Sequence, residues 1–294
     1  MWFTYGLLFY NYVVGFSGVN SGAIILVGQV ADALSTPVVG LLSDRGQSCW
    51  ALKYGKRKTW HLIGTICVIG TTPFMYSPCI GCTHEKEWKQ LIYYCVFVAI
   101  FQFGWASVQI SHLSLAPDLT PDENERTSLL SIRYSFTVLS NLAVYLVTWL
   151  VLEIGSSNNE SQLSSSDTMK FQEIAYTICG VGAITSIAFH ATVKERNPQE
   201  PLLEGENIPE TTPRLSLKQI FSRLQLYQVA CVYMATRLFS NISQSLIPLY
   251  LHDYLRLGAQ SLAIVPFVMF LSSFLTSLII RLLNTYLGRK VFTH

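Results

Sequence analysis

The sequence predicts an all-α polytopic membrane protein. Of its 294 residues 50% are hydrophobic and 13% are charged, whereas a soluble domain carries about a quarter charged residues. Eight apolar runs are also close to the roughly 20 residues that a helix needs to cross a bilayer. These runs occupy residues 1–16, 22–42, 59–78, 91–113, 132–153, 172–193, 225–247 and 258–283. We therefore expect eight transmembrane helices.

The distribution of Lys and Arg predicts which side of the membrane each loop faces. The loops after the even-numbered runs other than the fourth, together with the tail, hold 13 of these residues, and the loops after the odd-numbered runs hold 4. The loop after the fourth run holds only Arg126. Because loops rich in Lys and Arg remain in the cytosol, we expect both chain ends to be cytosolic.

Two features of the predicted non-cytosolic loops agree with this orientation. Asn159-Glu-Ser161 matches the N-glycosylation sequence, although a chance match in a loop rich in Ser and Asn is an equal alternative. Cys79 and Cys82 fit a disulfide or two free thiols better than a zinc site, because His84 alone does not complete a set of four ligands.

The segment 194–222 interrupts the hydrophobic pattern. It contains four prolines and many charges, a composition that is typical of a flexible linker. We expect residues 1–193 to form a six-helix transmembrane bundle and 194–222 to be a cytosolic linker. Residues 223–294 would then form a partial second bundle of two helices.

Asp32 is the only charged residue in the second run. A charge at the middle of a transmembrane helix costs about 2.5–3.5 kcal/mol, so it persists where it meets water or a partner. Asp32 and Thr36 are four residues apart and share one face of the helix. We expect this face to border a polar cavity.

Further polar residues repeat at helical spacing in the fourth, fifth and seventh runs. We expect them to line the same cavity, as binding residues for a solute or a cation: Gln109, His112, Arg133, Asn141, Arg237 and Asn241. Alternatives remain for several of them. Asp32 and Arg133 could form a structural ion pair, Gln109 and His112 could join helices by hydrogen bonds, and Arg133 could reach the cytosolic interface.

A short signature follows the second run. Gly40, Asp44, Arg45, Gly55, Lys56 and Arg57 occur in the order of the loop signature of the major facilitator superfamily, which this stretch resembles. Gly288-Arg289-Lys290 follows six helices later, as in transporters with two similar halves. In that family the loop is a gate, where basic side chains bind the carbonyl ends of helices. The resemblance implies a major facilitator fold of twelve helices, so we expect a complete first half and only the first two helices of the second.

Within the superfamily, the second run resembles the melibiose-carrier-like group of glycoside-pentoside-hexuronide:cation symporters. The frame Asp32-Ala-Leu-Ser-Thr36-Pro37-Val-Val-Gly40 carries the resemblance. Thr36 replaces the second acid of that frame, and Gln109 stands where some members hold another acid. A single remaining carboxylate suits coupling to a proton better than to sodium, because it can alternate between charged and neutral forms.

Three segments are similar to a vertebrate subgroup of major-facilitator-domain proteins, which import cysteine into lysosomes and melanosomes. They are QFGWASVQISHLSLAPDL (102–119), KYGKRKTWHLIGT (53–65) and MATRLFSNISQS (234–245). This resemblance implies secondary transport of cysteine across a lysosomal or melanosomal membrane. Arg133 or Arg237 would then bind the carboxylate of the solute, and Asp32 would carry the counter-charge or the proton.

Two other functions stay open at this point. The chain could be a symporter for a sugar or a lysophospholipid, or a shortened form that transports nothing and regulates a full-length partner. We expect a small-molecule solute, a coupling proton or sodium ion and the lipid bilayer as partners. The sequence offers no nucleotide motif, complete metal-ligand set, nucleophile–base pair or basic nucleic-acid surface. We therefore expect neither a cofactor, nor enzymatic activity, nor nucleic-acid binding.

Overall fold

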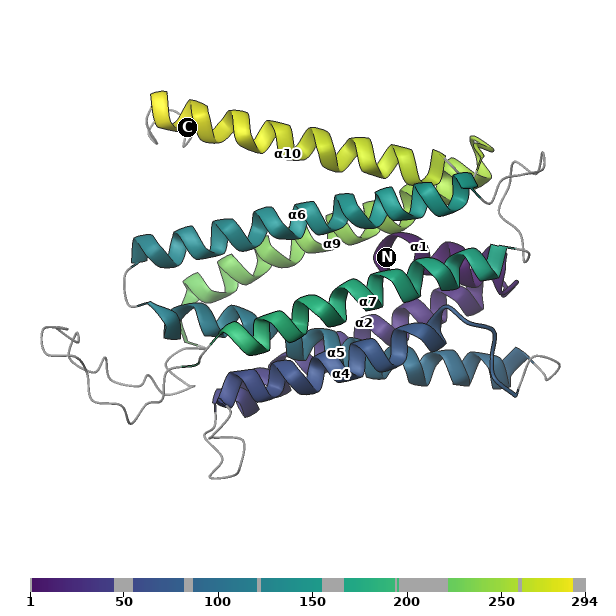
Figure 1. Cartoon of the computed structure of the whole chain (residues 1–294), viewed down its shortest axis with the longest axis horizontal. Helices are drawn as coiled ribbons and strands as arrows, with labels where there is room; N and C mark the ends of the chain where they lie inside the picture. Colours follow the sequence, from purple (N-terminus) through teal and green to yellow (C-terminus); the bar gives the residue numbers. More distant parts are fainter. Residues whose placement is uncertain are drawn as a thin grey trace, which may run out of the picture.

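A computed structural model (Figure 1) describes residues 2–44, 55–81, 87–120, 123–154, 167–193, 195, 222–258 and 261–287. The described residues form helices, turns and bends and contain no strand. A helix lies at each of the eight apolar runs, which confirms the predicted all-α class. The helices are α1 (Trp2–Leu8) with the π-helical turn η1 (Phe9–Val13), α2 (Gly18–Asp44), α4 (Lys56–Met75), α5 (Glu87–Leu119), α6 (Glu123–Ile154), α7 (Thr168–Thr192), α9 (Leu224–Asp253) and α10 (Ser261–Leu287).

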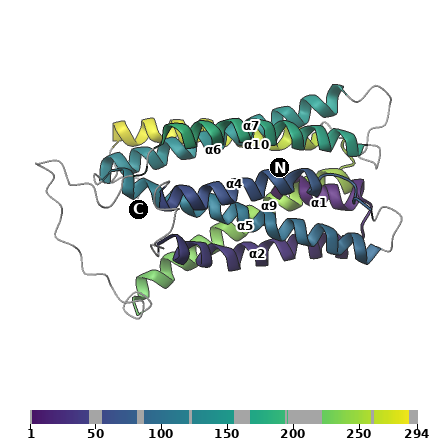
Figure 2. The same cartoon turned by 60° about the horizontal axis from the view of Figure 1, so that its bottom comes forward.

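The long helices run side by side, roughly along one axis (Figures 1 and 2). In the first bundle, α5 packs against α4 and α2, while α7 packs against α4 and α6. The last two helices dock on this bundle at two places, α9 on α1 and α10 on α6. The surface between α1 and α6 on one side and α9 and α10 on the other is therefore the boundary between the two parts.

Four of the described helices are long and apolar enough to cross a bilayer: Gly18–Ser43, Glu87–Leu115, Ser128–Leu152 and Thr168–Thr192. Their outward faces are apolar as well. On α2, for example, Leu26 and Leu34 are about two-thirds exposed. Large apolar side chains along an exposed helix face fit contact with lipid, where burial inside the protein brings no added hydrophobic gain.

The packed core surrounds α1 and η1. Phe9 and Tyr10 are fully buried there, and their rings contact Phe171 of α7 at 5.5 Å and Tyr94 of α5 at 5.1 Å between centroids. Edge-on and tilted ring pairs at such distances stabilise a core beyond their buried area. The first helix therefore holds helices from different parts of the bundle together.

Helices α5 and α6 are longer than the apolar runs that predict them. The predicted spans are 91–113 and 132–153, and the acidic segment from Asp118 to Glu125 between them predicts a solvated loop. Helix α5 instead continues to Leu119 and α6 starts at Glu123. The prediction of a loop was wrong for Asp118, Glu123 and Glu125, because charged residues end a hydrophobic run without ending a helix outside the bilayer core. Asp122 lies outside the described residues.

Helices α4 and α5 approach most closely where two glycines meet. A Cβ added to Gly64 would lie 2.6 Å from the carbonyl oxygen of Gly104, and a Cβ on Gly104 would lie 2.8 Å from the carbonyl oxygen of Gly64. Small residues at such crossings allow two membrane helices to pack backbone against backbone. Because both residues are glycines, no side-chain carbon separates the two backbones at this contact.

We expect Gly64→Ala to destabilise the protein by about 1–3 kcal/mol, because the new methyl group must push the two backbones apart. Gly70→Ala is the matched control on the same helix, since nothing lies within 4 Å of its added Cβ. The measurement is thermal unfolding of the purified protein in detergent. Equal melting temperatures for the two variants would contradict this account of the α4–α5 contact.

Candidate functional site

Asp32 lies near the middle of α2 and is half-buried. Thr36, one turn later, hydrogen-bonds to its carboxylate, so the predicted shared face of these two residues exists. The carboxylate also interacts electrostatically with Arg237, near the middle of α9. The two side chains form no direct ion pair in the described part of the chain. This interaction crosses from the first bundle to the second.

Arg133 has a different partner from the one considered in the sequence. Its guanidinium donates a hydrogen bond to the Gln109 side-chain oxygen, between α6 and α5, and it interacts electrostatically with His112. The carboxylate of Asp32 is not among its described contacts. The predicted residues therefore form two groups: Asp32, Thr36 and Arg237 in one, and Gln109, His112 and Arg133 in the other.

Two predicted asparagines complete the set. Asn241 lies one helical turn after Arg237 on α9, and Asn141 lies two turns after Arg133 on α6; both are half-buried. Among the described hydrogen bonds, none joins either amide to the two groups. Their predicted roles as binding residues remain predictions.

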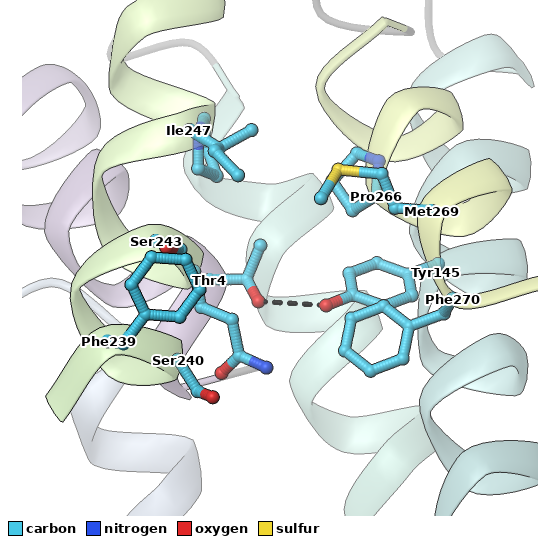
Figure 3. A pocket seen from close by; sticks show the side chains of 11 residues that line it. Thr4, Tyr145, Phe239, Ser240, Ser243, Ile247, Pro266, Met269 and Phe270 are labelled. Carbon is cyan, nitrogen blue, oxygen red and sulfur yellow. Dashed lines mark hydrogen bonds between the residues drawn. The ribbon is translucent and has the colours of Figure 1, made fainter. Parts of the chain in front are cut away.

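A cavity of about 370 Å³ lies between the two parts of the molecule. Figure 3 shows it, with Phe239, Ser240 and Ser243 of α9 on one side and Met269 and Phe270 of α10 on the other. At its base, the hydroxyl groups of Thr4 and Tyr145 are hydrogen-bonded at 3.0 Å. The lining is thus apolar with several hydroxyl groups. None of the predicted binding residues lines this cavity, although Arg237 lies two residues before Phe239 on the same helix.

A second cavity, of about 320 Å³, lies within the first bundle between α4, α5 and α7. His61 is buried there. Its Nδ1 and Nε2 of His190 are joined by a hydrogen bond of 3.1 Å, in which either ring can be the donor. The ring of Phe189 contacts both His61 and His112. Nδ1 of His112 is buried without a hydrogen-bond partner in the described structure. The interhelical hydrogen bond in this cavity is thus made by His61 and His190, whereas His112 contacts α7 through its ring and Gln109 makes the interhelical bond to Arg133.

The predicted gating loop meets the end of α7. Gly55 has φ +111°, a conformation that favours glycine, and its position leaves room for Glu195, whose carboxylate would lie 2.5 Å from an added Cβ. That carboxylate accepts hydrogen bonds from the backbone N–H groups of Arg57, at 2.9 and 3.1 Å, and Lys58, at 3.1 Å. An acid at this place stabilises the positive end of the α4 dipole.

Lys58 completes a reciprocal contact. Its buried ammonium donates to the carbonyl oxygens of His190, at 3.1 Å, and Val193, at 2.6 Å. Lys58 thus satisfies carbonyl groups at the end of α7 while Glu195 satisfies N–H groups at the start of α4. Lys58, a basic residue of the loop that is not one of the six signature residues, binds carbonyl ends in the way that the resemblance implies for the loop.

The structure describes some of the remaining predicted residues and not others. Asp44 is the last residue of α2, and Lys56 is the first residue of α4. Gly40 lies within α2 and is half-buried. Arg45 and the glycosylation candidate Asn159 lie outside the described residues.

The profile of the MFS/sugar transport protein family matches residues 2–293, nearly the whole chain. The chain belongs to the major facilitator superfamily. It is 42% identical over 306 residues to the human major facilitator superfamily domain-containing protein 12, an alignment that covers 99% of this chain and 64% of that relative.

Bacterial members of the superfamily are also similar to the chain. An uncharacterized symporter of Synechocystis is 27% identical over 68% of this chain and 35% of its own length. An inner membrane symporter of Escherichia coli is 29% identical over 52% of this chain and 32% of its own length. The chain thus spans less than two thirds of the human relative and about a third of each bacterial one.

Glu195 and Lys58 are the residues that the sequence analysis missed. The sequence does contain a signal for Glu195. This acid lies two residues after the end of the sixth run, on the side of the membrane where the basic loop after the second run was also predicted to lie. An acid on that side of the membrane is a candidate partner for the loop after the second run, which holds five basic residues. The spacing of residues 58 and 195 in the chain, however, does not reveal that the two helix ends meet.

We expect Glu195→Gln to lower stability by about 1–2 kcal/mol, because a neutral amide binds the helix N-terminus more weakly than a carboxylate. Glu173→Gln, an exposed acid on α7, is the matched control. Thermal unfolding at low and at high salt measures the difference. If the two variants unfold at the same temperature, the Glu195 contact is not stabilising.

Proposed function

We propose that the chain forms part of the solute pathway of a secondary active transporter, with Asp32 and Arg237 as the charged groups on that pathway. The observation that carries the proposal is their electrostatic interaction, which connects α2 of the first bundle with α9 of the second. Transporters of this type bind solute between their two halves, near the middle of the membrane. Charged residues near the middle of the membrane are rare, and those that occur usually have a function.

The proposed solute is cysteine. A zwitterionic amino acid needs a cation for its carboxylate and an acid for its ammonium group, and the guanidinium of Arg237 and the carboxylate of Asp32 provide both. The nearby cavity of about 370 Å³ offers hydroxyl groups beside Met269 and the aromatic rings of Phe239 and Phe270, which suits a short, weakly polar side chain. The resemblance of three sequence segments to cysteine importers supports the same solute.

The coupling ion that we propose is a proton. Asp32 is the only acid in the second run, and its helical neighbour at the second acid position is Thr36. A single carboxylate can bind and release a proton as its access to water changes. A sodium site would need more oxygen ligands than this frame offers.

We also propose a lysosomal or melanosomal membrane as the location, with the N-terminus in the cytosol. The resemblance to the organellar subgroup supports the first statement. The excess of Lys and Arg in the predicted cytosolic loops supports the second, and so does Cys79, which is disulfide-bonded to a residue outside the described part. Disulfides persist on the non-cytosolic side of membranes. Asn159 would carry a glycan on that same side.

The proposed division of the chain is a six-helix bundle at 1–193, a cytosolic linker at 194–222 and a partial second bundle at 223–294. A second candidate function is binding to a longer relative and regulating it, since the chain spans 64% of the human relative that it matches. Uptake assays of the chain alone in proteoliposomes, with labelled cysteine and with a labelled sugar, separate the functions. Cysteine flux supports the proposal, sugar flux favours the sugar-transport description of the family, and no flux favours regulation.

We expect Asp32→Asn to abolish the pH dependence of cysteine uptake, because an amide cannot carry the coupled proton. Asp167→Asn, at the start of α7, is the control for loss of a carboxylate elsewhere. Initial uptake rates with and without a proton gradient measure the effect. A gradient response that survives in the Asp32→Asn variant would contradict the coupling role.

We expect Arg237→Gln to raise the KM for cysteine at least about tenfold, because a hydrogen-bonded charge pair contributes roughly 1.5–3 kcal/mol. Arg223→Gln, at the start of the same helix, is the matched control. Arg237→Lys retains the charge but not the two-pronged geometry and should be intermediate. An unchanged KM in the Arg237→Gln variant would remove Arg237 from the binding site.

A further inference from the structure

The cavity of about 320 Å³ inside the first bundle is separate from the cavity beside the proposed solute pathway. Its walls come from α4, α5 and α7, whereas the cavity in Figure 3 lies between the two parts of the molecule. The two cavities share no lining residue. Small-molecule sites have volumes of about 300–1,000 Å³. The cavity inside the first bundle is therefore large enough for a ligand of its own.

This cavity opens onto the outer surface of the bundle. Gly182 and Thr185 of α7 line it, and both are exposed. The surface around them is apolar: Ile184 and Ile187 of α7 are each 69% exposed, and Ile66 of α4 is 63% exposed. Apolar side chains on the outside of a membrane bundle contact lipid. A ligand therefore reaches this cavity from within the bilayer.

The cavity is polar at one end and mainly apolar beyond it. The rings of His61 and His112 form the polar end, close to the ends of the predicted spans 59–78 and 91–113. Ile69 lies about two helical turns after His61, about 12 Å deeper in the bilayer. The deeper lining includes Val68, Ile69, Trp105, Val108 and Gly182. A ligand that matches this gradient has a polar group at the edge of the bilayer and an apolar body inside it.

The polar end offers hydrogen-bonding groups but no fixed charge. Among the described residues that line the cavity, none is Lys, Arg, Asp or Glu. The ammonium of Lys58, at the same end of α4, is bound to two carbonyl oxygens of the α7 end. Lipid headgroups with phosphate are held by clusters of Lys and Arg. The lining therefore favours a ligand whose polar group is uncharged.

Nδ1 of His112 is the hydrogen-bonding group that remains available at this end. It is buried without a hydrogen-bond partner in the described structure, whereas Nδ1 of His61 is bonded to Nε2 of His190. Buried polar atoms nearly always have a partner. A hydroxyl group suits this nitrogen, because it can donate to one tautomer of the imidazole ring and accept from the other. One alcohol group would satisfy the polar end.

The apolar part of the cavity suits a rigid, flat body. Gly182 leaves its part of the wall without a side chain, and nothing lies within 4 Å of a Cβ added there. Val68 and Val108 are β-branched and therefore have few side-chain rotamers. A fused ring system loses little conformational freedom against such walls, whereas a flexible acyl chain loses more. The shape of the cavity thus favours rings over an acyl chain.

We propose that this cavity binds a membrane sterol, with the sterol hydroxyl on Nδ1 of His112 and the fused rings beside Gly182. The sterol contacts α4, α5 and α7 together, so its binding stabilises the first bundle. This site is distinct from the solute pathway, and the proposal holds whichever solute the chain carries.

The test is photo-crosslinking in phosphatidylcholine nanodiscs with a cholesterol analogue that carries a diazirine in its ring system. Mass spectrometry then locates the labelled residues, and we expect them on α4, α5 and α7 among those that line the cavity. Unlabelled cholesterol should compete with the probe. Cholesterol methyl ether cannot donate a hydrogen bond and should compete at least about fivefold more weakly, as expected for the loss of one hydrogen bond.

Two glycine variants provide a matched comparison on α7. Gly182→Phe places a ring in the cavity and should lose the labelling. Gly180→Phe should retain it, because Gly180 does not line the cavity. Both glycines are exposed, and nothing lies within 4 Å of a Cβ added to either, so both variants should have the same melting temperature without sterol. Added cholesterol should raise the melting temperature of the Gly180→Phe variant only.

Equal labelling of the two glycine variants would overturn the sterol site, and so would equal competition by cholesterol and its methyl ether. A photoreactive phosphatidylcholine that labels the same residues to the same extent would indicate ordinary contact with bilayer lipid, and it would overturn the proposal too. The competition experiment uses the parent protein, so it decides the question even if Gly182→Phe fails to fold. None of these readouts requires solute flux, so the sterol site and the transport proposal can fail separately.

Discussion

A carboxylate inside a bilayer must face water or a compensating charge, and Asp32 satisfies this constraint through Arg237. The cost of a mid-membrane charge, about 2.5–3.5 kcal/mol on insertion scales, is large for one side chain. Asp32 and Arg237 belong to different parts of the molecule, and they interact without a direct ion pair. Arg237 thus offsets part of the burial cost of the half-buried Asp32, while its own exposed side chain remains able to bind a solute. In the proposed mechanism, the carboxylate of a zwitterionic solute pairs with Arg237 and its ammonium group pairs with Asp32.

Contacts at the two ends of the molecule differ in what they connect. Glu195 and Lys58 join α4 to the end of α7 within the first bundle, so this contact can persist while the two parts of the molecule move. Tyr12 and Asp253 join the first helix to α9, so this contact must break if the parts separate at that end. Alternating access needs both kinds of contact, since rigid bundles must be held together while the boundary between them opens.

Much of the fold could be predicted from hydrophobicity, because the membrane requires long apolar segments whose backbone groups bond internally. Each of the eight runs coincides with a helix, and the shared face of Asp32 and Thr36 follows from helical periodicity alone. A loop was predicted for acidic residues that lie at the end of α5 and the start of α6. Hydropathy detects where a helix leaves the bilayer, but not where the helix ends. Helix ends depend on capping contacts, such as that of Glu195, which hydropathy does not detect.

The partners of the polar residues could not be predicted in the same way. Periodicity places Arg133 and Arg237 on their helices, but it cannot reveal which of them faces Asp32, because that depends on how the helices pack. Helix packing depends on contacts such as that of Gly64 with Gly104, where small residues from different segments meet. Tyr12 and Asp253 are 241 residues apart in the chain, and no local pattern connects them. Resemblance to the superfamily supplied the arrangement of helices, but not these individual contacts.

The most direct test of the central claim is a double-mutant cycle on cysteine binding to the purified chain, measured by calorimetry. It compares the parent protein with Asp32→Asn, Arg237→Gln and the double variant. If both side chains bind one zwitterion, their effects are coupled, and the double variant should bind no more weakly than the weaker single variant. Additive losses, or affinity that neither substitution changes, would contradict a shared site between α2 and α9.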